Sequence, residues 1–259
     1  MKRIFSLIFL VLFTMTAVSA QDTVKKYWSN KKLMSVGLQQ NGVETGLWVY
    51  YHKNGVKWME GRYENGKKVG KWTEWYNDGK RSREFESVKG PFKSWYPSGK
   101  IESEGQMENG QKTGEWTFLY PNGNLFKKVN YLNDSVQGDV TEYHDNGKKK
   151  FEGHYDNGRL NGYTQWWSAN GQKDMEGKTV NDLQEGEWKF YHQDGSLGSV
   201  GSFSKGMQEG EWKYYFESGK LWKIVHYKDD KRQGESKAWY ESGKLQRQGN
   251  FADDKEDGV

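Results

Sequence analysis

Residues 46–55 read Gly-Leu-Trp-Val-Tyr-Tyr-His-Lys-Asn-Gly, an aromatic and β-branched run that begins and ends with glycine. The same pattern opens nine successive units, and the opening glycines stand 24 residues apart except for one interval of 20. These glycines are Gly46, Gly70, Gly90, Gly114, Gly138, Gly162, Gly186, Gly210 and Gly234, and Gly258 begins another unit. Such a regular period indicates a repeat protein. It disfavours an enzyme with one pocket, because the distinctive residues recur in every unit.

Each unit has the pattern of a β-hairpin followed by a turn. In the first unit, Asn54-Gly55 separates the strand-like runs 47–53 and 56–64, and Asn65-Gly66 follows the second run. Asn-Gly between two such runs predicts a type I′ turn at Asn54-Gly55, since both central residues need positive φ. The second turn is looser, because Asn-Asp or Asp-Asp replaces Asn-Gly in several units. Glycine at this frequency disfavours helices. We therefore predict an all-β chain, an elongated single-sheet meander of tandem β-hairpin repeats with about eighteen strands.

The N-terminus carries a separate signal. Lys2 and Arg3 precede the apolar run 4–13, and Val18-Ser19-Ala20 is a small-x-small cleavage site. This order is typical of a secretory signal peptide, and the apolar run is short for a membrane span. We expect residues 1–20 to be a cleaved signal peptide, so that the mature chain begins at Gln21 and is periplasmic or extracellular.

The rest of the chain divides into a cap and an array. Residues 21–45 keep parts of the repeat without its opening glycine and are expected to form a degenerate N-terminal capping repeat. Residues 46–259 hold nine tandem units of about 24 residues and a truncated end. The unit from Gly70 to Lys89 lacks four residues, which predicts a local kink.

Composition excludes several classes of partner and site. The full chain has 39 Lys and Arg against 35 Asp and Glu, and the mature chain loses only Lys2 and Arg3 from the basic side. No broad basic field favours nucleic acid. After the signal peptide, no segment is apolar enough to cross a membrane. Cysteine is absent, so neither disulfides nor a cysteine nucleophile are available.

Aromatic residues recur at three positions, counted from the opening glycine as zero. Position +2 is most often Trp, +17 is most often Tyr or Phe, and +5 is aromatic in eight of the nine units. Positions +2 and +5 have opposite parity, so either both sheet faces carry aromatic rows or a bulge returns both to one face. We expect +2 and +17 to pack and +5 to be partly exposed, which makes +5 the candidate partner-binding position. Its aromatic residues are Tyr51, Trp75, Trp95, Tyr143, Trp167, Tyr191, Tyr215 and Trp239.

No catalytic, cofactor or metal site is predicted. His52, His144 and His192 share position +6, where four other units have Tyr. Two repeats of a sheet separate His144 from His192 by about 20 Å. A zinc ion needs ligands about 2 Å away, so they cannot share one. The glycine at +15, as in Gly61, is expected to make room for a ring from the next strand or for a bulge.

The repeats resemble MORN-variant repeats, which occur in proteins assigned to the YwqK-type antitoxin family. The residues that carry the resemblance are Gly46-Leu47-Trp48, Asn54-Gly55 and Gly61-Arg62-Tyr63-Glu64-Asn65-Gly66, with their echoes in residues 24–258. The resemblance implies a non-enzymatic protein that contacts other proteins or membrane surfaces.

The sequence therefore predicts an exported, non-enzymatic scaffold that binds a protein or envelope partner through its aromatic hairpins. An antitoxin or immunity protein that neutralises a toxin, and a carbohydrate or cell-wall binding module, are the alternatives.

Overall fold

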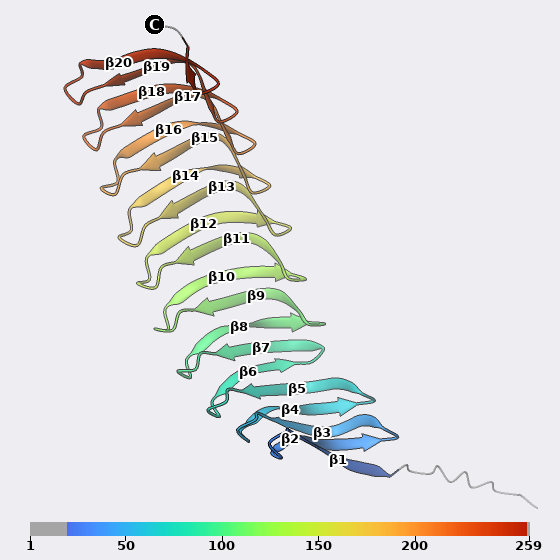
Figure 1. Ribbon diagram of the computed structural model, residues 1–259. Coiled ribbons are helices and arrows are strands. Elements are labelled where there is room, and N and C mark those ends of the chain that lie inside the picture. Colours follow the sequence, from blue (N-terminus) through green and yellow to red (C-terminus); the bar gives the residue numbers. More distant parts are fainter. Residues whose placement is uncertain (1–19, 258–259) are drawn as a thin grey trace, which may run out of the picture.

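The computed structural model describes residues 20–257, which form one open antiparallel sheet of 21 strands and no helix (Figure 1). Each strand pairs with the strands before and after it in sequence, so the chain is an uninterrupted meander. The strands are β1 (Gln21–Tyr27), β2 (Leu33–Gln40), β3 (Val43–Tyr51), β4 (Lys57–Glu64), β5 (Lys67–Trp75), β6 (Arg81–Glu86), β7 (Lys89–Trp95), β8 (Ile101–Glu108), β9 (Gln111–Leu119), β10 (Leu125–Leu132), β11 (Ser135–Tyr143), β12 (Lys149–Asp156), β13 (Arg159–Trp167), β14 (Lys173–Val180), β15 (Leu183–Tyr191), β16 (Leu197–Ser204), β17 (Met207–Tyr215), β18 (Leu221–Lys228), β19 (Lys231–Trp239), β20 (Leu245–Ala252) and β21 (Lys255–Glu256).

The predicted fold class is confirmed, with more strands than expected. The N-terminal cap is a complete hairpin, β1 and β2, and β21 is a short strand at the end of the ninth unit. Figure 1 shows the hairpins side by side along an elongated ribbon, with all first turns on one long edge and all second turns on the other. The predicted signal peptide lies outside the described residues. No helix of the described part is long and apolar enough to span a membrane.

The first and second turns have different types from those that the sequence suggested. In the first turn, the Gly55 N–H donates to the His52 carbonyl at 2.9 Å, and of Asn54 and Gly55 only Gly55 has positive φ. This is a type I turn closed by a glycine in the left-handed region, so the predicted type I′ geometry is wrong here. The second turn is type I′, with φ of 49° at Asn65 and 73° at Gly66. Asn and Asp tolerate positive φ, which explains Asn-Asp and Asp-Asp in this tight turn.

Both faces of the sheet carry aromatic residues, because +2 and +5 lie on opposite sides. We call the side with Trp48, Tyr50, Met59 and Tyr63 the tryptophan face; it carries positions +2, +4, +13 and +17. The other side, the opposite face, carries +1, +3, +5, +11 and +14, represented by Leu47, Val49, Tyr51, Lys57 and Glu60. A bulge between +4 and +5 also turns the +12 side chain toward the tryptophan face, where Trp58 packs against Tyr50.

The core is built from tryptophans that lie on glycines. The +2 tryptophans are 0–2% exposed, although the sheet is a single layer. A Cβ at Gly61 would stand 2.1 Å from Cδ2 of Trp72, and the same holds within 2.3 Å for the other Gly–Trp pairs. These pairs are Gly37–Trp48, Gly61–Trp72, Gly105–Trp116, Gly177–Trp188 and Gly201–Trp212. The prediction for the +15 glycine is therefore confirmed. The glycine makes room for the tryptophan ring of the next strand, and a β-bulge lies at the same point of the ladder.

Where glycine is absent at +15, the tryptophan at +2 of the next unit is absent as well. The combinations are Phe85 with Phe92, Val129 with Val140, and Val225 with Ser236. Gly153 faces Thr164, and Phe151 and Leu160 fill the remaining space above it. The side chain at +15 and the side chain at +2 of the next unit thus fill one shared volume between them.

The shortened unit changes the ladder locally. Strand β6 has six residues, and its partner β7 pairs with it without the bulge present at the other boundaries between units. Phe85 stands directly opposite Phe92 in this junction. The sheet continues through it, because β7 pairs with β6 on one side and with β8 on the other.

Candidate functional site

The eight predicted aromatics at +5 form a row along the opposite face. All are half-buried, so the structure places them between core and surface. Basic side chains at +11 of the preceding unit cover several of these rings. Lys57 Nζ lies 4.8 Å from the Trp75 ring centroid, and Lys149 Nζ lies 4.9 Å from that of Trp167. Arg81 and Lys173 occupy the same position over Trp95 and Tyr191. These contacts are cation–π interactions.

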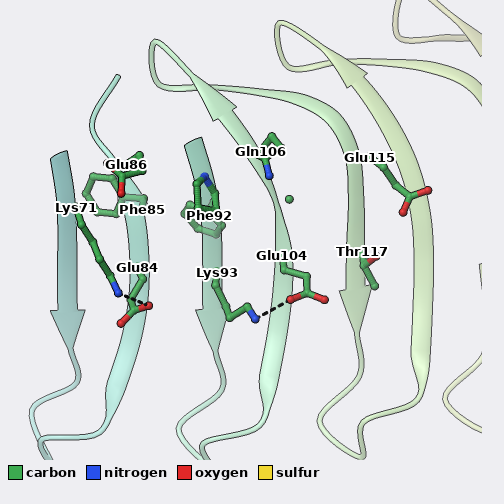
Figure 2. Close-up of a pocket in the computed structure, with 12 residues that line it drawn as sticks. Lys71, Glu84, Phe85, Glu86, Phe92, Lys93, Glu104, Gln106, Glu115 and Thr117 are labelled. Carbon is green, nitrogen blue, oxygen red and sulfur yellow. Dashed lines mark ion pairs between the residues drawn. The ribbon is translucent and has the colours of Figure 1, made fainter. Parts of the chain in front are cut away.

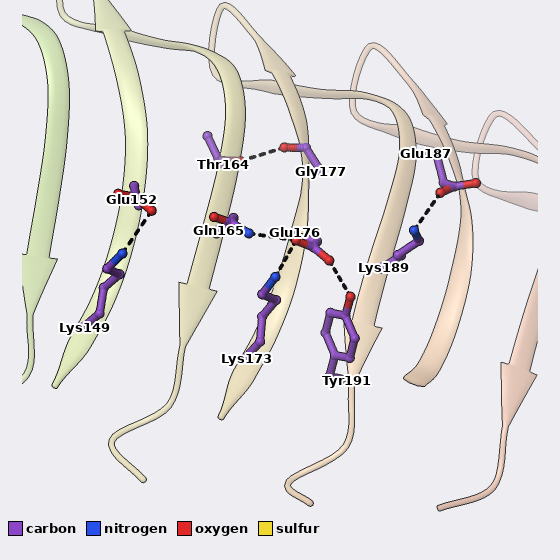
Figure 3. Close-up of polar contacts among 10 residues, drawn as sticks. All are labelled: Lys149, Glu152, Thr164, Gln165, Lys173, Glu176, Gly177, Glu187, Lys189 and Tyr191. Carbon is purple, nitrogen blue, oxygen red and sulfur yellow. Dashed lines mark hydrogen bonds and ion pairs between the residues drawn. The ribbon is translucent and has the colours of Figure 1, made fainter. Parts of the chain in front are cut away.

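The same basic residues are held by a glutamate at +14. Lys57 Nζ lies 2.6 Å from Glu60, and Lys149 Nζ lies 3.1 Å from Glu152 (Figure 3 shows the second pair). Each pair spans a bulge on one strand and leaves the cation over the neighbouring ring. In these units the chain covers its own aromatic row.

Glu176 is the most enclosed of these glutamates, with 8% of the residue exposed. Its carboxylate accepts hydrogen bonds from Lys173 Nζ at 2.7 Å, Gln165 Nε2 at 2.8 Å and the Tyr191 hydroxyl (Figure 3). Burial alone would raise the pKa of Glu176, but these hydrogen bonds outweigh it and lower the pKa to about 2. Burial and the bond to Glu176 raise the pKa of Tyr191. The cluster is a structural anchor between β13, β14 and β15.

The opposite face becomes apolar in its C-terminal third. The +11 residue is leucine in the last three units, and +14 is no longer a glutamate. We call the resulting surface on β16 to β20 the leucine patch. It consists of Leu197, Val200, Tyr215, Leu221, Ile224, Trp239 and Leu245. Leu245 is 52% exposed, and the other members are half-buried.

Charged pairs lie along one row of the leucine patch, where their lysines alternate with Val200 and Ile224. Lys213 lies between Val200 and Ile224 in the ladder, and its Nζ turns to Glu211 at 3.0 Å. Lys189–Glu187 and Lys237–Glu235 repeat this arrangement at 3.3 and 2.8 Å (Figure 3 shows the first). The lysine stems extend along the apolar surface while their ammonium groups leave it.

The histidines at +6 have a structural task along the first-turn edge. His52 Nε2 lies 2.9 Å from the Trp75 carbonyl, and His144 and His192 contact the next unit's +5 carbonyl in the same way. A carbonyl only accepts, so Nε2 carries the proton. Tyr76, Tyr96 and Tyr120 make this bond with their hydroxyls. Among the described residues, no group of three or more His, Cys, Asp or Glu side chains could hold a metal ion.

A hollow of about 510 Å³ lies at the junction of the shortened unit (Figure 2). Its lysines are already paired, Lys71 with Glu84 at 3.1 Å and Lys93 with Glu104 at 2.9 Å. Glu115 on the far wall pairs with Lys128 at 3.5 Å. The hollow is therefore a polar groove whose two lysines are both paired within the chain.

The sequence pattern of the MORN repeat variant matches seven segments that together cover more than half of the chain. The segments are residues 44–66, 89–109, 112–133, 136–157, 184–204, 208–229 and 232–253. The chain belongs to the MORN repeat variant family. MORN hairpins also form where the pattern does not match, since β5–β6 and β13–β14 pair like the others. Those units lack one residue of the usual pair, because Phe85 replaces the glycine at +15 or Thr164 replaces the tryptophan at +2.

Other comparisons add little to the MORN assignment. No curated protein matches the chain. Among solved structures, the chain is similar to the complex TcdB2-TccC3-Cdc42 and to the Tc holotoxin pore of Photorhabdus luminescens. Identities are 11% and 10%, and the TM-score is 0.21 for both. The match covers 88% of this chain and 14% of each of those chains. At this level neither structure bears on the function of the MORN array.

Sequence reasoning found the aromatic row of the MORN hairpins but missed the change that divides it. Four of the eight rings lie under a basic side chain, whereas Tyr215 and Trp239 lie among leucines. The signal was present in the sequence at +11 and +14 together. Leu197 with Val200 and Leu221 with Ile224 are apolar at both positions, whereas every earlier unit has a charged residue at +14. The change is not visible at +2, +5 and +17, the positions where the aromatic residues recur.

Proposed function

We propose that this protein is an exported, non-enzymatic MORN repeat scaffold that binds a protein partner through the leucine patch. MORN repeats are generally non-enzymatic, and the ionisable clusters described above are structural pairs. The observation that carries the proposal is the loss of the Lys–Glu cover over the last units of the aromatic row. A row of leucines and aromatic rings with charged pairs beside it, as Tyr215–Leu221 and Trp239–Leu245 form here, has the anatomy of a protein interface.

The chemistry of the leucine patch favours a protein over a glycan. Sugar rings stack on flat aromatic faces and need hydrogen-bonding groups beside them. The leucine patch instead presents Leu197, Leu221 and Leu245 around two aromatic rings. Aliphatic and aromatic side chains of a partner would fill the spaces between these leucines, and partner charges would meet the Glu–Lys pairs.

The leucine patch can be tested by introducing the Lys–Glu pair that other units carry at +11 and +14. In Leu221→Lys/Ile224→Glu, the +11 and +14 residues become those of the units that carry Lys57–Glu60 and Lys149–Glu152. We expect the hairpin to fold and partner affinity to fall about 30-fold or more, the effect of losing one interface anchor of about 2 kcal/mol. The partner captured by wild-type protein from an envelope extract would be purified and its affinity measured by calorimetry.

The reverse change is the matched control. Lys57→Leu/Glu60→Val uncovers the ring of Trp75 far from the patch and should leave the affinity unchanged. Equal binding by wild type and the Leu221→Lys/Ile224→Glu variant would contradict the proposal. A partner that proves to be a toxin would make the protein an immunity protein, as its resemblance to YwqK-type antitoxins implies.

Export has its own test. The proposed signal peptide rests on Lys2 and Arg3, the apolar run 4–13 and the Val18-Ser19-Ala20 site. Protein purified from its native cells should begin at Gln21 when its N-terminus is sequenced. A chain that still begins at Met1 would contradict cleavage without affecting the proposal for the leucine patch.

A further inference from the structure

A second hollow, of about 500 Å³, opens on the tryptophan face near the first-turn edge, between the units of Gly186 and Gly210. Its walls include Phe190 and His192 from one unit and Tyr214, Phe216 and Trp222 from the next. Gly198 lies between these walls. The volume lies within the usual range of small-molecule sites.

Position +12 explains why the hollow exists. In three units this position is aromatic, and the ring packs against the ring at +6 of the same unit. The centroid distances are 6.2 Å for Trp58–His52, 5.2 Å for Phe126–Tyr120 and 6.0 Å for Trp222–Phe216. In the unit of Gly186, position +12 is Gly198, so His192 has no such ring beside it.

The first unit shows which group would fit. There Trp58 packs against Tyr50 and His52 at +4 and +6, with both centroids 6.2 Å away. Phe190 and His192 occupy the same two positions beside Gly198. His192 is held as His52 is, by its Nε2 bond to the Tyr215 carbonyl at 3.0 Å. The missing element relative to the first unit is an indole.

The far wall adds aromatic surface that the first unit lacks. Trp222 is 41% exposed. Phe216 occupies +6 and, unlike His or Tyr there, has no side-chain donor for the +5 carbonyl of the next unit. Lys223 Nζ lies 4.1 Å from the Tyr214 ring and 4.7 Å from the Trp222 ring, which steadies both rings. A ring placed beside Gly198 would lie between His192 and this wall.

We propose that the Gly198 hollow binds one planar aromatic ring, the tryptophan side chain of a protein partner. Aromatic rings gain from edge and offset contacts with other rings beyond the burial of their area. The site opens on the tryptophan face and shares only Tyr215 with the leucine patch, so the proposal stands whether or not that patch binds a partner.

The test uses N-acetyl-L-tryptophanamide as the probe and fluorine NMR of protein labelled with 5-fluorotryptophan. Trp222 is assigned from the signal lost in Trp222→Phe. We expect the probe to shift the Trp222 resonance saturably, with millimolar affinity. N-acetylglucosamine, titrated over the same range, should leave it in place. A missing shift at saturating probe, or an equal shift with the sugar, would overturn the proposal.

Two variants locate the site. Gly198→Trp supplies the chain's own indole, as Trp58 does, and should abolish the shift. A Cβ at Gly198 would lie 3.3 Å from the His192 ring, so the ring must move slightly and we expect at most a small loss of melting temperature. Lys150→Trp places an indole at the same repeat position beside His144 and should keep the affinity within about twofold, since it is remote from the hollow. A shift that persists in folded Gly198→Trp would overturn the proposal. If that variant does not fold, Trp222→Ala decides, with the affinity of wild type and variant read from saturation-transfer signals of the probe itself: affinity unchanged overturns the site, and a loss of about tenfold or more supports it.

Discussion

Gly177→Val should lower the free energy of unfolding by about 3–5 kcal/mol, the range for removing a buried aromatic side chain. A Cβ at Gly177 would lie 2.3 Å from Cδ2 of Trp188, which is 1% exposed. The indole would have to leave its place and lose the Nε1 bond to the Lys178 carbonyl at 3.0 Å. Urea unfolding measures the loss. Hydrogen exchange should place it mainly in β13 to β16, because each repeat contacts its neighbours.

A compensating change makes the explanation specific. The double variant Gly177→Val/Trp188→Val copies the buried Val129 and Val140 of another boundary. It should be more stable than Gly177→Val alone, with a coupling energy of about 2 kcal/mol between the two sites. Gly249→Val is the matched control, since a Cβ there meets nothing within 4 Å, and its effect should stay within about 0.5 kcal/mol. Additive losses in the double variant would contradict the shared volume.

The fold could be predicted from the sequence because every unit repeats the same glycines, turn residues and aromatic positions. Opposite parity of +2 and +5 left two arrangements open, and the bulges that decide between them arise from pairing across strands. The coupling of +15 to the next unit's +2 was visible in the letters, as Gly with Trp or Val with Val. Only the distance between Cβ and indole shows why the two must change together.

The turn types were assigned to the wrong positions for a chemical reason. Asn-Gly occurs in both turns, so the dipeptide alone does not separate a type I turn with a following glycine from a type I′ turn. Asn133-Asp134 and Asp229-Asp230 mark the true type I′ turns, because all four residues have positive φ. At the first turn, the Asn54 side chain accepts the Val56 N–H at 3.0 Å and Asn54 itself keeps an ordinary φ.

The candidate sites were harder to predict than the fold. The leucine patch and the Gly198 hollow are defined by departures from the repeat at +11, +14 and +12. A departure has meaning only when the residue it replaces has a known neighbour. Trp58 against His52, and Lys57 over Trp75, supply those neighbours in the structure.

Acid should weaken the array through Glu176. The folded pKa of about 2 lies below the ordinary glutamate value of 4.5, so the folded state binds the proton less readily than the unfolded chain does. The resulting stabilisation is fully present above pH 4.5 and is lost as the pH falls from there toward 2. A shift of this size corresponds to roughly 3 kcal/mol. Urea unfolding of the wild type at a series of pH values should show the loss in this window.

Glu176→Gln separates this group from the other carboxylates. Glutamine keeps the shape of the side chain but cannot carry the charge that Lys173, Gln165 and Tyr191 stabilise. The variant should be less stable than wild type by up to roughly 3 kcal/mol at pH 7, and the difference should shrink toward zero near pH 2. Glu152→Gln removes the equivalent pair with Lys149, whose glutamate side chain is 45% exposed, and should cost less than about 1 kcal/mol. A Glu176→Gln difference that does not change with pH would show that packing, and not the buried charge, joins β13, β14 and β15.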